Sequence, residues 1–486
     1  MQIFEYMGRK MKFFPILENL EVVDAGVEGN AVAKHGEKVV FVPFVVPGDI
    51  IDVKITEKKK SYLHGRAIAI KKFSPLRINP LCEHFTVCGG CKWQNMQYAD
   101  QLKFKQKQVE DALSRIGKID ISGIQTILEN ESPFYYRNKL EFTFSNFRWL
   151  EDFQKGESLE DRNMNGLGFH KPGMFDRVVD VQTCYLMDVI ANKIRNQIKA
   201  YAISQNLTFF DIKRRDGFLR NLIIRNTLDG DLMVILVFYK ESEAERLALL
   251  DFVKNSFPQI TSLIYIINSK PNDSIADQDF DVYHGKPFIT ETMTTLDGKM
   301  VKFQIGPKSF YQTNSRQANR LYNIVMDFAN PQGSEILYDL YTGTGTIANF
   351  LAHRVQRVVG IEYISEAIED AQINAQINGI QNSNFVAGDM VKVLNDEFVA
   401  RFGKPDIIIT DPPRAGMHAD VVKMILKLEP KRIVYVSCNP ATQARDLALL
   451  VEKYTVKKLQ PVDMFPQTGH VENIALLELM PSIAND

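Results

Sequence analysis

The C-terminal part of this 486-residue chain constrains its fold most, because short apolar segments alternate there with segments typical of helices. Strands are predicted at 336–340, 357–361, 384–387, 406–410 and 432–436, with a helix near 365–378. This alternation predicts an α/β fold with a doubly wound, mostly parallel sheet. Ligands of such sheets bind beyond the carboxyl ends of the strands, so the residues that follow each strand are the candidates for chemistry.

Two β-rich regions precede this sheet. Between about 17 and 72, short strands with frequent turns predict a small barrel. Its end, from Lys54 to Lys72, carries seven basic residues and one acid, which suits RNA phosphates or simply a solvated hairpin. A second region has predicted strands at 140–144, 222–225, 232–238 and 262–267. Basic residues at 137, 139, 213–215, 220 and 225 lie there among aromatic ones, and they suit either RNA contact or a solvated sheet face.

A helix is predicted between these regions, at 100–116. Leu102, Val109, Leu113 and Ile116 recur at helical spacing and form its apolar face. We expect this helix to pack on a neighbouring domain.

Composition and charge are ordinary for a globular protein. The formal net charge is -1, so any nucleic-acid surface must come from local clustering of basic residues. The first 20 residues carry several charges and no apolar core, and no uncharged apolar run is long enough to span a bilayer. We therefore expect a cytoplasmic protein with no membrane contact.

The first predicted strand of the α/β region runs into a glycine turn at 341–346, where a ligand can approach the backbone at a helix start. The turn also fits the loose dinucleotide fingerprint, which keeps a nicotinamide dehydrogenase open. Glu362, at the end of the next strand, can accept hydrogen bonds from the ribose of either cofactor. Asp389 follows the third strand, where it could meet an adenine edge.

Asp411 follows the fourth strand and begins the motif Asp-Pro-Pro-Arg. Two prolines make a rigid, extended loop that directs the carboxylate into the ligand cleft. Methyltransferases that act on amino groups carry an aromatic residue after the prolines, and Arg414 stands there instead. Methylation of an exocyclic amine is therefore disfavoured.

Methylation of uracil carbon 5 requires a thiolate that adds to carbon 6 and a base that later removes the carbon-5 proton. Cys438 follows the fifth strand, in the motif Ser-Cys-Asn-Pro, and is the candidate nucleophile. Glu472 precedes an apolar strand at 474–479 and is the candidate base; His470 is the rival.

Three of the five cysteines fall within ten positions, which indicates a metal site rather than a disulfide scaffold. Cys82, Cys88 and Cys91 are followed by Cys184 as a possible fourth ligand. Structural zinc sites more often use two Cys-x-x-Cys pairs, and only one such pair is present. The spacing thus favours an iron-sulfur cluster, with zinc as the alternative.

Taken together, these residues resemble the RNA uracil-5-methyltransferase family, and within it the ribosomal-RNA branch that carries an iron-sulfur cluster. The matching motifs span nearly the whole chain and occur in order: a TRAM-like barrel, Cys-x5-Cys-Gly-Gly-Cys at 82–91, Tyr-Arg-Asn-Lys at 136–139, Phe-Tyr-Gln-Thr-Asn at 310–314, Asp-Leu-Tyr at 339–341, Asp-Pro-Pro-Arg at 411–414, Ser-Cys-Asn-Pro at 437–440 and Gly-His-Val-Glu at 469–472. Thr342 and Thr346 depart from residues that many relatives carry, and Thr346 leaves one cofactor contact open.

The resemblance implies a Rossmann-like S-adenosylmethionine-dependent methyltransferase domain at 301–486. It would follow an extension at 1–14, a TRAM-like RNA-binding barrel at 15–73 and a β-rich central RNA-binding and iron-sulfur region at 74–300. Contacts to S-adenosyl-L-methionine are implied for Gln312, Tyr341, Glu362, Asp389 and Asp411. Cys438 would be the nucleophile and Glu472 the base, and Cys82, Cys88, Cys91 and Cys184 would hold a [4Fe-4S] cluster.

The expected substrate is RNA, with 23S rRNA favoured because the tRNA branch generally lacks both the barrel and the cluster. We expect the protein to act as a monomer. A tRNA uracil-5-methyltransferase and a non-catalytic RNA-binding iron-sulfur protein are the alternatives.

Overall fold

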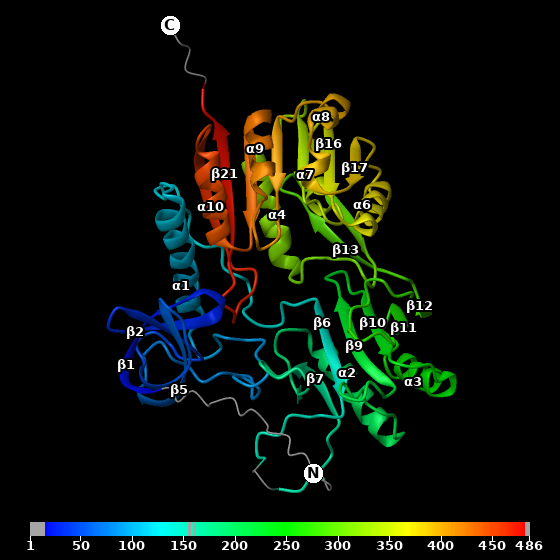
Figure 1. The fold of residues 1–486 in the computed structure, drawn as a ribbon. Helices are drawn as coiled ribbons and strands as arrows, with labels where there is room; N and C mark the ends of the chain where they lie inside the picture. Colours follow the sequence, from blue (N-terminus) through cyan, green and yellow to red (C-terminus); the bar gives the residue numbers. More distant parts are fainter. Residues whose placement is uncertain (1–14, 154–156, 160–161, 482–486) are drawn as a thin grey trace, which may run out of the picture. The chain divides into compact units, whose positions relative to one another are not determined.

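A computed structural model of the chain describes residues 15–153, 157–159 and 162–481 (Figure 1). The predicted extension at 1–14 lies outside the described residues. The described residues form two compact units: unit one contains 15–80, 91–104 and 467–469, and unit two contains the other described residues. No helix in the described part has the length and apolarity needed to cross a bilayer.

Unit one is built around a closed five-stranded barrel with strand order β1-β2-β3-β5-β4. The strands are β1 (Ile16–Ala25), β2 (Asn30–His35), β3 (Lys38–Pro43), β4 (Ile50–Lys58) and β5 (Tyr62–Lys72). All pairs are antiparallel except β3 with β5. Alternate side chains such as Val22, Val40 and Val53 fill the interior, as a half-buried strand requires.

The predicted basic run occupies the hairpin formed by β4 and β5. All seven basic side chains are exposed. Lys59 pairs with Glu57 at 2.6 Å and Lys71 pairs with Asp52 at 3.0 Å, so these two charges are partly balanced. The other five leave a positive strip on the outside of the barrel.

The short segment 467–469 joins unit one through buried hydrogen bonds to residues 92–101. The Gln101 side chain donates to the Gln467 side chain at 3.0 Å and accepts from the Gln467 backbone N–H at 3.0 Å. The backbone N–H of Trp93 donates to the Gln467 carbonyl at 3.1 Å. The chain therefore passes through unit one just before it reaches Glu472.

The predicted helix at 100–116 is present, but its last turn differs from the prediction. Helix α1 (Tyr98–Asp111) continues into η2 (Ala112–Gly117), which is a π-helical turn. A π turn needs more residues than an α turn, so the apolar face rotates. Val109 and Leu113 are buried, whereas Ile116 is exposed, which corrects the predicted face. Element η2 packs on helix α10 (Pro440–Leu450) of unit two, as a Cβ built on Gly117 would lie only 2.8 Å from the Ala444 carbonyl oxygen.

Unit two contains two seven-stranded sheets. The first has the order β12-β11-β10-β9-β6-β7-β8. Its strands are β6 (Lys139–Ser145), β7 (Gly166–His170), β8 (Val178–Asp180), β9 (Leu219–Asn226), β10 (Leu232–Phe238), β11 (Ser262–Ile267) and β12 (Asp281–Gly285). Helices α2 (Val189–Ser204) and α3 (Glu243–Ser256) pack against each other and share one core with this sheet.

The opposite face of the sheet shares a core with the hairpin of β13 (Ile289–Thr294) and β14 (Met300–Ile305). This hairpin spans the predicted boundary between 300 and 301.

The basic residues of the region do not form one surface. Arg220 and Arg225 are buried and donate to backbone carbonyls, and of this set only Lys213, Arg214 and Arg215 are exposed. The idea that Arg220 and Arg225 contact RNA is therefore wrong. Both guanidinium groups are buried, and both are already hydrogen-bonded to backbone carbonyls.

The second sheet is the predicted doubly wound one, with the order β17-β16-β15-β18-β19-β21-β20 (Figure 1). Five parallel strands are β15 (Ile336–Leu340), β16 (Arg357–Glu362), β17 (Ser383–Ala387), β18 (Ile407–Thr410) and β19 (Arg432–Ser437). The antiparallel strands β20 (Tyr454–Val462) and β21 (Glu472–Leu479) complete the edge. The helices of this domain, besides α10, are α4 (Ser315–Ala329), α5 (Thr346–Leu351), α6 (Ser365–Ile377), α7 (Met390–Val393), α8 (Asp396–Phe402) and α9 (Ala419–Leu428). The fold is thus a Rossmann-like α/β domain joined to a β-rich region and a small barrel.

Candidate active site

Cys438 lies in the turn between β19 and α10, at the carboxyl end of the parallel sheet. Asn439 caps α10 by accepting a hydrogen bond from the Ala441 N–H, and Pro440 stands in the first turn, where a missing N–H costs nothing. The cysteine is thereby held in a short, well-defined turn, with its side chain partly accessible.

Glu472 is brought opposite Cys438 by strand register. In the antiparallel pair of β19 and β21, the last recorded partners are Ser437 and Asn473, and Cys438 and Glu472 are the residues directly beyond them; the charge of Glu472 also raises the pKa of Cys438. Opposed residues of an antiparallel pair project to the same side with their Cβ atoms about 4.5–5.5 Å apart. The two candidate catalytic residues, 34 positions apart in the sequence, are therefore neighbours.

A buried pair of amides fixes this register. The Gln443 side chain, on α10, donates to the backbone carbonyls of Tyr435 and Asn473 at 2.9 and 3.1 Å. The Asn473 side chain donates back to the Gln443 oxygen at 2.7 Å. Both side chains are fully buried. This pair joins the helix that follows Cys438 to the strand that begins with Glu472, and neither residue was singled out from the sequence.

The loop that begins at Asp411 is tied to the cysteine turn. The side chains of Asn439 and Thr442 donate to the Arg414 carbonyl at 3.0 and 3.2 Å. Farther along the loop, the Met417 N–H donates to the buried carboxylate of Asp446 at 2.8 Å. The Asp-Pro-Pro-Arg loop and the Cys438 turn therefore form one connected edge of the site.

Electrostatics at this edge favour neutral forms of the acids. Burial raises the pKa of Glu472 to about 8, with a further contribution from the negative charge of Asp411. Burial and the charge of Asp339 raise the pKa of Asp411 to about 7. Burial, Glu472 and Asp411 raise the pKa of the Cys438 thiol to about 11, while Arg414 lowers the pKa of both Cys438 and Glu472. Shifts of this kind, grouped in one place, are typical of a functional site.

The glycine turn after β15 has the conformation of a ligand cradle. Tyr341 adopts a left-handed φ of 65°, which is unusual for a bulky side chain and typical of functional turns. Gly343 is also left-handed, and a Cβ built there would meet nothing within 4 Å, so the space beside its backbone is open. Asp339 is buried, and its Oδ1 has no hydrogen-bond partner among the described residues. These observations fit a nucleotide-type cofactor at this turn.

Glu362 and Asp389 lie at the ends of the next two strands, as predicted. One Glu362 oxygen accepts from the Gly343 N–H at 3.1 Å, and the other accepts from the N–H groups of Tyr363 and Ile364. A carboxylate has about four acceptor positions, so capacity for a ribose hydroxyl remains. Asp389 caps α7 by accepting from the Val391 N–H at 3.1 Å and is half-exposed.

Gln312 lies in the loop before α4, and Asn138 holds this loop in place. The Asn138 side chain donates to the Gln312 carbonyl at 2.9 Å and to the Ser315 hydroxyl at 2.7 Å. Ser315 in turn donates to Glu291, whose pKa burial raises to about 7. The motif around Tyr136–Lys139 thus supports the loop of a predicted cofactor residue through direct hydrogen bonds.

The four cysteines of the predicted cluster are divided between the units. Cys82, Cys88 and Cys184 belong to unit two, and Cys91 belongs to unit one. Burial, followed by the charges of Cys88 and Cys184, raises the pKa of Cys82 to about 11. Cys91 is buried and accepts a hydrogen bond from the Gln94 amide at 3.2 Å. No group of three or more His, Cys, Asp or Glu side chains in the described ranges is arranged to hold a metal ion, so the cluster stays a prediction.

Comparisons with known proteins agree with this geometry. A family profile described as tRNA (uracil-5-)-methyltransferase matches residues 218–480, and a TRAM domain profile matches residues 19–68. An uncharacterized RNA methyltransferase of Bacteroides thetaiotaomicron is 54% identical and covers 93% of this chain and 99% of its own. One from Porphyromonas gingivalis is 52% identical, with coverage of 94% and 99%.

One solved structure is similar over nearly the whole chain. It is the tRNA (uracil-54, C5)-methyltransferase of Pyrococcus abyssi in complex with S-adenosyl-L-homocysteine. The TM-score is 0.72 at 28% sequence identity, and the alignment covers 94% of this chain and all of that one.

Proposed function

Because the chain belongs to the RNA uracil-5-methyltransferase family, we propose that it transfers a methyl group from S-adenosylmethionine to carbon 5 of a specific uridine, with Cys438 as nucleophile and Glu472 as base. The observation that supports these roles most directly is that Glu472 and Cys438 lie directly beyond the paired Ser437 and Asn473, where Asp411 and Arg414 influence the pKa of both.

Each residue has a defined task in this proposal. The Cys438 thiolate forms a bond from Sγ to uracil carbon 6, and the ring electrons move to carbon 5 and oxygen 4 as an enolate. S-adenosylmethionine would supply the electrophilic methyl group: as carbon 5 takes it up, the sulfonium–methyl bond breaks and S-adenosylhomocysteine is the leaving group. The Glu472 carboxylate then removes the carbon-5 proton, the carbon 5–carbon 6 double bond re-forms, and the Cys438 thiolate is expelled. Arg414 assists both residues, because its positive charge lowers the pKa of each.

The cofactor residues follow from the same edge of the sheet. We propose that Glu362 accepts from the ribose hydroxyls, Asp389 meets the adenine, and Gln312, Tyr341 and Asp411 contact the remaining part of S-adenosylmethionine. The open cradle at Gly343 and the left-handed Tyr341 support this assignment.

The boundaries 15–73, 74–300 and 301–486 remain our proposed domains, with 1–14 as an extension, and we propose a monomer that acts in the cytoplasm.

We also propose that Cys82, Cys88, Cys91 and Cys184 hold a structural [4Fe-4S] cluster. Two observations support this proposal. The charges of Cys88 and Cys184 raise the pKa of Cys82, and the Gln94 amide donates a hydrogen bond to the Cys91 sulfur. Cys184→Ser should remove the brown colour and weaken RNA binding while the affinity for S-adenosylmethionine is unchanged. Anaerobically prepared protein should contain iron and sulfide in near-equal amounts. Zinc alone in that preparation would contradict a cluster.

The RNA substrate is proposed to be 23S rRNA, with tRNA as the second candidate. One observation supports tRNA as a candidate substrate. The alignment with the Pyrococcus tRNA enzyme covers 94% of this chain, and the uncovered part is too short to contain the whole barrel at 15–73. The barrel therefore does not separate the two RNA classes. Unmodified 23S rRNA and tRNA transcripts should be compared as methyl acceptors, and RNA from a deletion strain should be mapped for the missing 5-methyluridine.

The reaction itself is tested with RNA that carries tritium on carbon 5 of uridine. The proposal requires one tritium released to water for each methyl group transferred, because the carbon-5 proton leaves in the last step. Methyl transfer without release would place the methyl group elsewhere. Absence of both transfer and S-adenosylmethionine binding would favour the non-catalytic RNA-binding alternative.

A further inference from the structure

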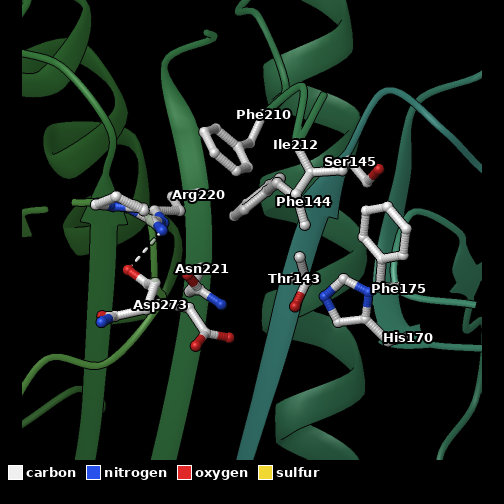
Figure 2. Close-up of a pocket in the computed structure, with 12 residues that line it drawn as sticks. Thr143, Phe144, Ser145, His170, Phe175, Phe210, Ile212, Arg220, Asn221 and Asp273 are labelled. Carbon is white, nitrogen blue, oxygen red and sulfur yellow. Dashed lines mark hydrogen bonds between the residues drawn. The ribbon is translucent and has the colours of Figure 1, made fainter. Parts of the chain in front are cut away.

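A hollow lies on the first seven-stranded sheet of unit two, the central sheet of the chain, and its lining residues differ from those of the proposed active site (Figure 2). It has a volume of about 230 Å³. Its walls come from strands β6 and β9, from the loop around Phe210 and Ile212, and from the loop at 271–273. This volume is below that of pockets for drug-sized ligands, so the hollow has room for one small ring system.

An unpartnered amide lies in this hollow. Asn221, on β9, is 1% exposed, and neither its side-chain oxygen nor its nitrogen forms a hydrogen bond with any described residue. Figure 2 shows it between Arg220 and Asp273 on one side and Thr143 and His170 on the other. Thr143 is its direct cross-strand partner on β6. A buried amide without partners is costly, so its donor and acceptor are best explained by a ligand that satisfies both.

Arg220 is not the ligand-binding group. Its guanidinium donates to the backbone carbonyls of Asn268, Lys270 and Asn272 at 2.5, 2.8 and 2.6 Å, which fixes the adjoining loop. The carboxylate of Asp273 also lines the hollow. With the cation engaged and a carboxylate present, the hollow disfavours a phosphate and favours an uncharged, hydrogen-bonding ring.

Aromatic rings line the hollow, and basic residues follow one of its loops. Phe144, Phe210 and Phe175 line the hollow, and Phe175 is 72% exposed at its mouth. Lys213, Arg214 and Arg215 follow Ile212 directly and are exposed; Lys213 pairs with Asp176 at 2.6 Å and Arg214 lies 3.9 Å from Asp211, so both charges are partly balanced. Aromatic rings suit the faces of a base, and basic side chains at a rim suit the phosphates of the same strand.

We propose that this hollow binds an unpaired nucleobase of the RNA substrate, distinct from the uridine that is methylated. The Asn221 amide pairs with the hydrogen-bonding edge of the base, as an asparagine amide can with a donor and an acceptor side by side. The aromatic walls stack on its faces. The inference rests on the proposed function for its substrate, and it assigns the central sheet a role in selecting RNA with a splayed-out base.

The test compares full-length wild-type protein with Asn221→Leu, Phe175→Ala and the control Phe153→Ala, which removes an exposed ring outside the hollow. The probes are a mixed-sequence single-stranded RNA of about 20 nucleotides and the duplex of the same sequence, measured by fluorescence anisotropy. Asn221→Leu and Phe175→Ala should each bind the single strand about 10-fold more weakly and the duplex as wild type does. For methyl transfer to RNA, KM should rise while kcat stays unchanged.

Asn221→Leu should melt no lower than wild type, because the amide has no protein partner to lose. If this variant fails to fold, Phe175→Ala carries the test alone, since its ring is exposed. Wild-type affinity for the single strand in both variants would overturn the proposal, as would equal losses for single strand and duplex. A small molecule that copurifies with wild type and is lost in Asn221→Leu would also overturn it. The binding measurements need no methyl transfer, so failure of the proposed reaction is recognised separately, by wild-type protein that binds RNA and does not methylate it.

Discussion

The buried amide pair of Gln443 and Asn473 is expected to be the mechanical link between nucleophile and base. Gln443→Leu removes two hydrogen bonds that Gln443 donates and one that it accepts, and it leaves the buried Asn473 amide without its partner. At about 1 kcal/mol for each of the three bonds and at least about 1 kcal/mol for the unpaired group, we expect unit two to lose roughly 4–5 kcal/mol of stability.

Activity should fall as well, because Gln443 holds the strand that positions Glu472 opposite Cys438. A displacement of about 1 Å can cost about 100-fold in rate. Single-turnover methyl transfer should therefore slow strongly while the affinity for S-adenosylmethionine stays near wild type. The double variant Gln443→Leu with Asn473→Leu should lose less stability than the two single variants together, with a coupling of about 1–3 kcal/mol.

Stability is measured by urea unfolding followed by circular dichroism, and rate by rapid quench. The matched control is Gln372→Leu on α6, where the side chain is exposed and the change should stay within about 0.5 kcal/mol. If Gln443→Leu unfolds at the wild-type urea concentration and transfers methyl groups at the wild-type rate, the amide pair does not position the site.

Three further outcomes follow from the same geometry. The kcat/KM for RNA should rise with pH through about 8, because Glu472 acts as a carboxylate and its pKa is raised to about 8. Arg414→Met should move this rise to higher pH, because the positive charge of Arg414 lowers the pKa of Glu472. A flat profile would exclude Glu472 as the base. Because the pKa of Glu472 is raised, the folded state holds this proton more tightly than the unfolded state, and stability falls as pH rises from about 4.5 to about 8. The melting temperature of Glu472→Gln should therefore increase relative to that of wild type between about pH 6 and pH 9. A constant difference in melting temperature would show that the carboxyl is not buried. Asn138→Ala should weaken S-adenosylmethionine binding about 10-fold in calorimetry by freeing the Gln312 loop, and lowered stability with unchanged affinity would limit Asn138 to a structural role.

Local sequence signals were sufficient for the catalytic sheet. The strand predicted at 336–340 coincides with β15, and the segments predicted at 357–361 and 432–436 lie within β16 and β19. These strands are short, mostly buried and largely apolar segments bounded by turns, so pattern and structure agree. Cys438 directly follows β19 and Glu472 begins β21, as the sequence predicted for their positions, while their catalytic roles stay predictions.

Features that depend on distant partners could not be predicted. The Gln443–Asn473 pair requires knowledge that α10 packs beside β21, although a glutamine beside Ala444 and Leu447 on a buried face was a usable signal. Arg220 and Arg225 resemble RNA-binding residues until the backbone carbonyls that they bind are known. The π-helical turn at Ala112–Gly117 rotated Ile116 into solvent without a sequence marker. The attachment of 467–469 to unit one depends on Gln101, more than 300 positions away.

The central claim is the covalent route through Cys438 and Glu472, and the most direct test is the Glu472→Gln protein mixed with RNA and S-adenosylmethionine. Proton removal and thiolate expulsion are blocked in this variant, whereas addition and methyl transfer are not. The account predicts a denaturation-resistant protein–RNA adduct with a methylated uridine attached at Cys438, and no adduct when Cys438→Ala is added. Release of methylated RNA by Glu472→Gln at the wild-type rate, without an adduct, would contradict it.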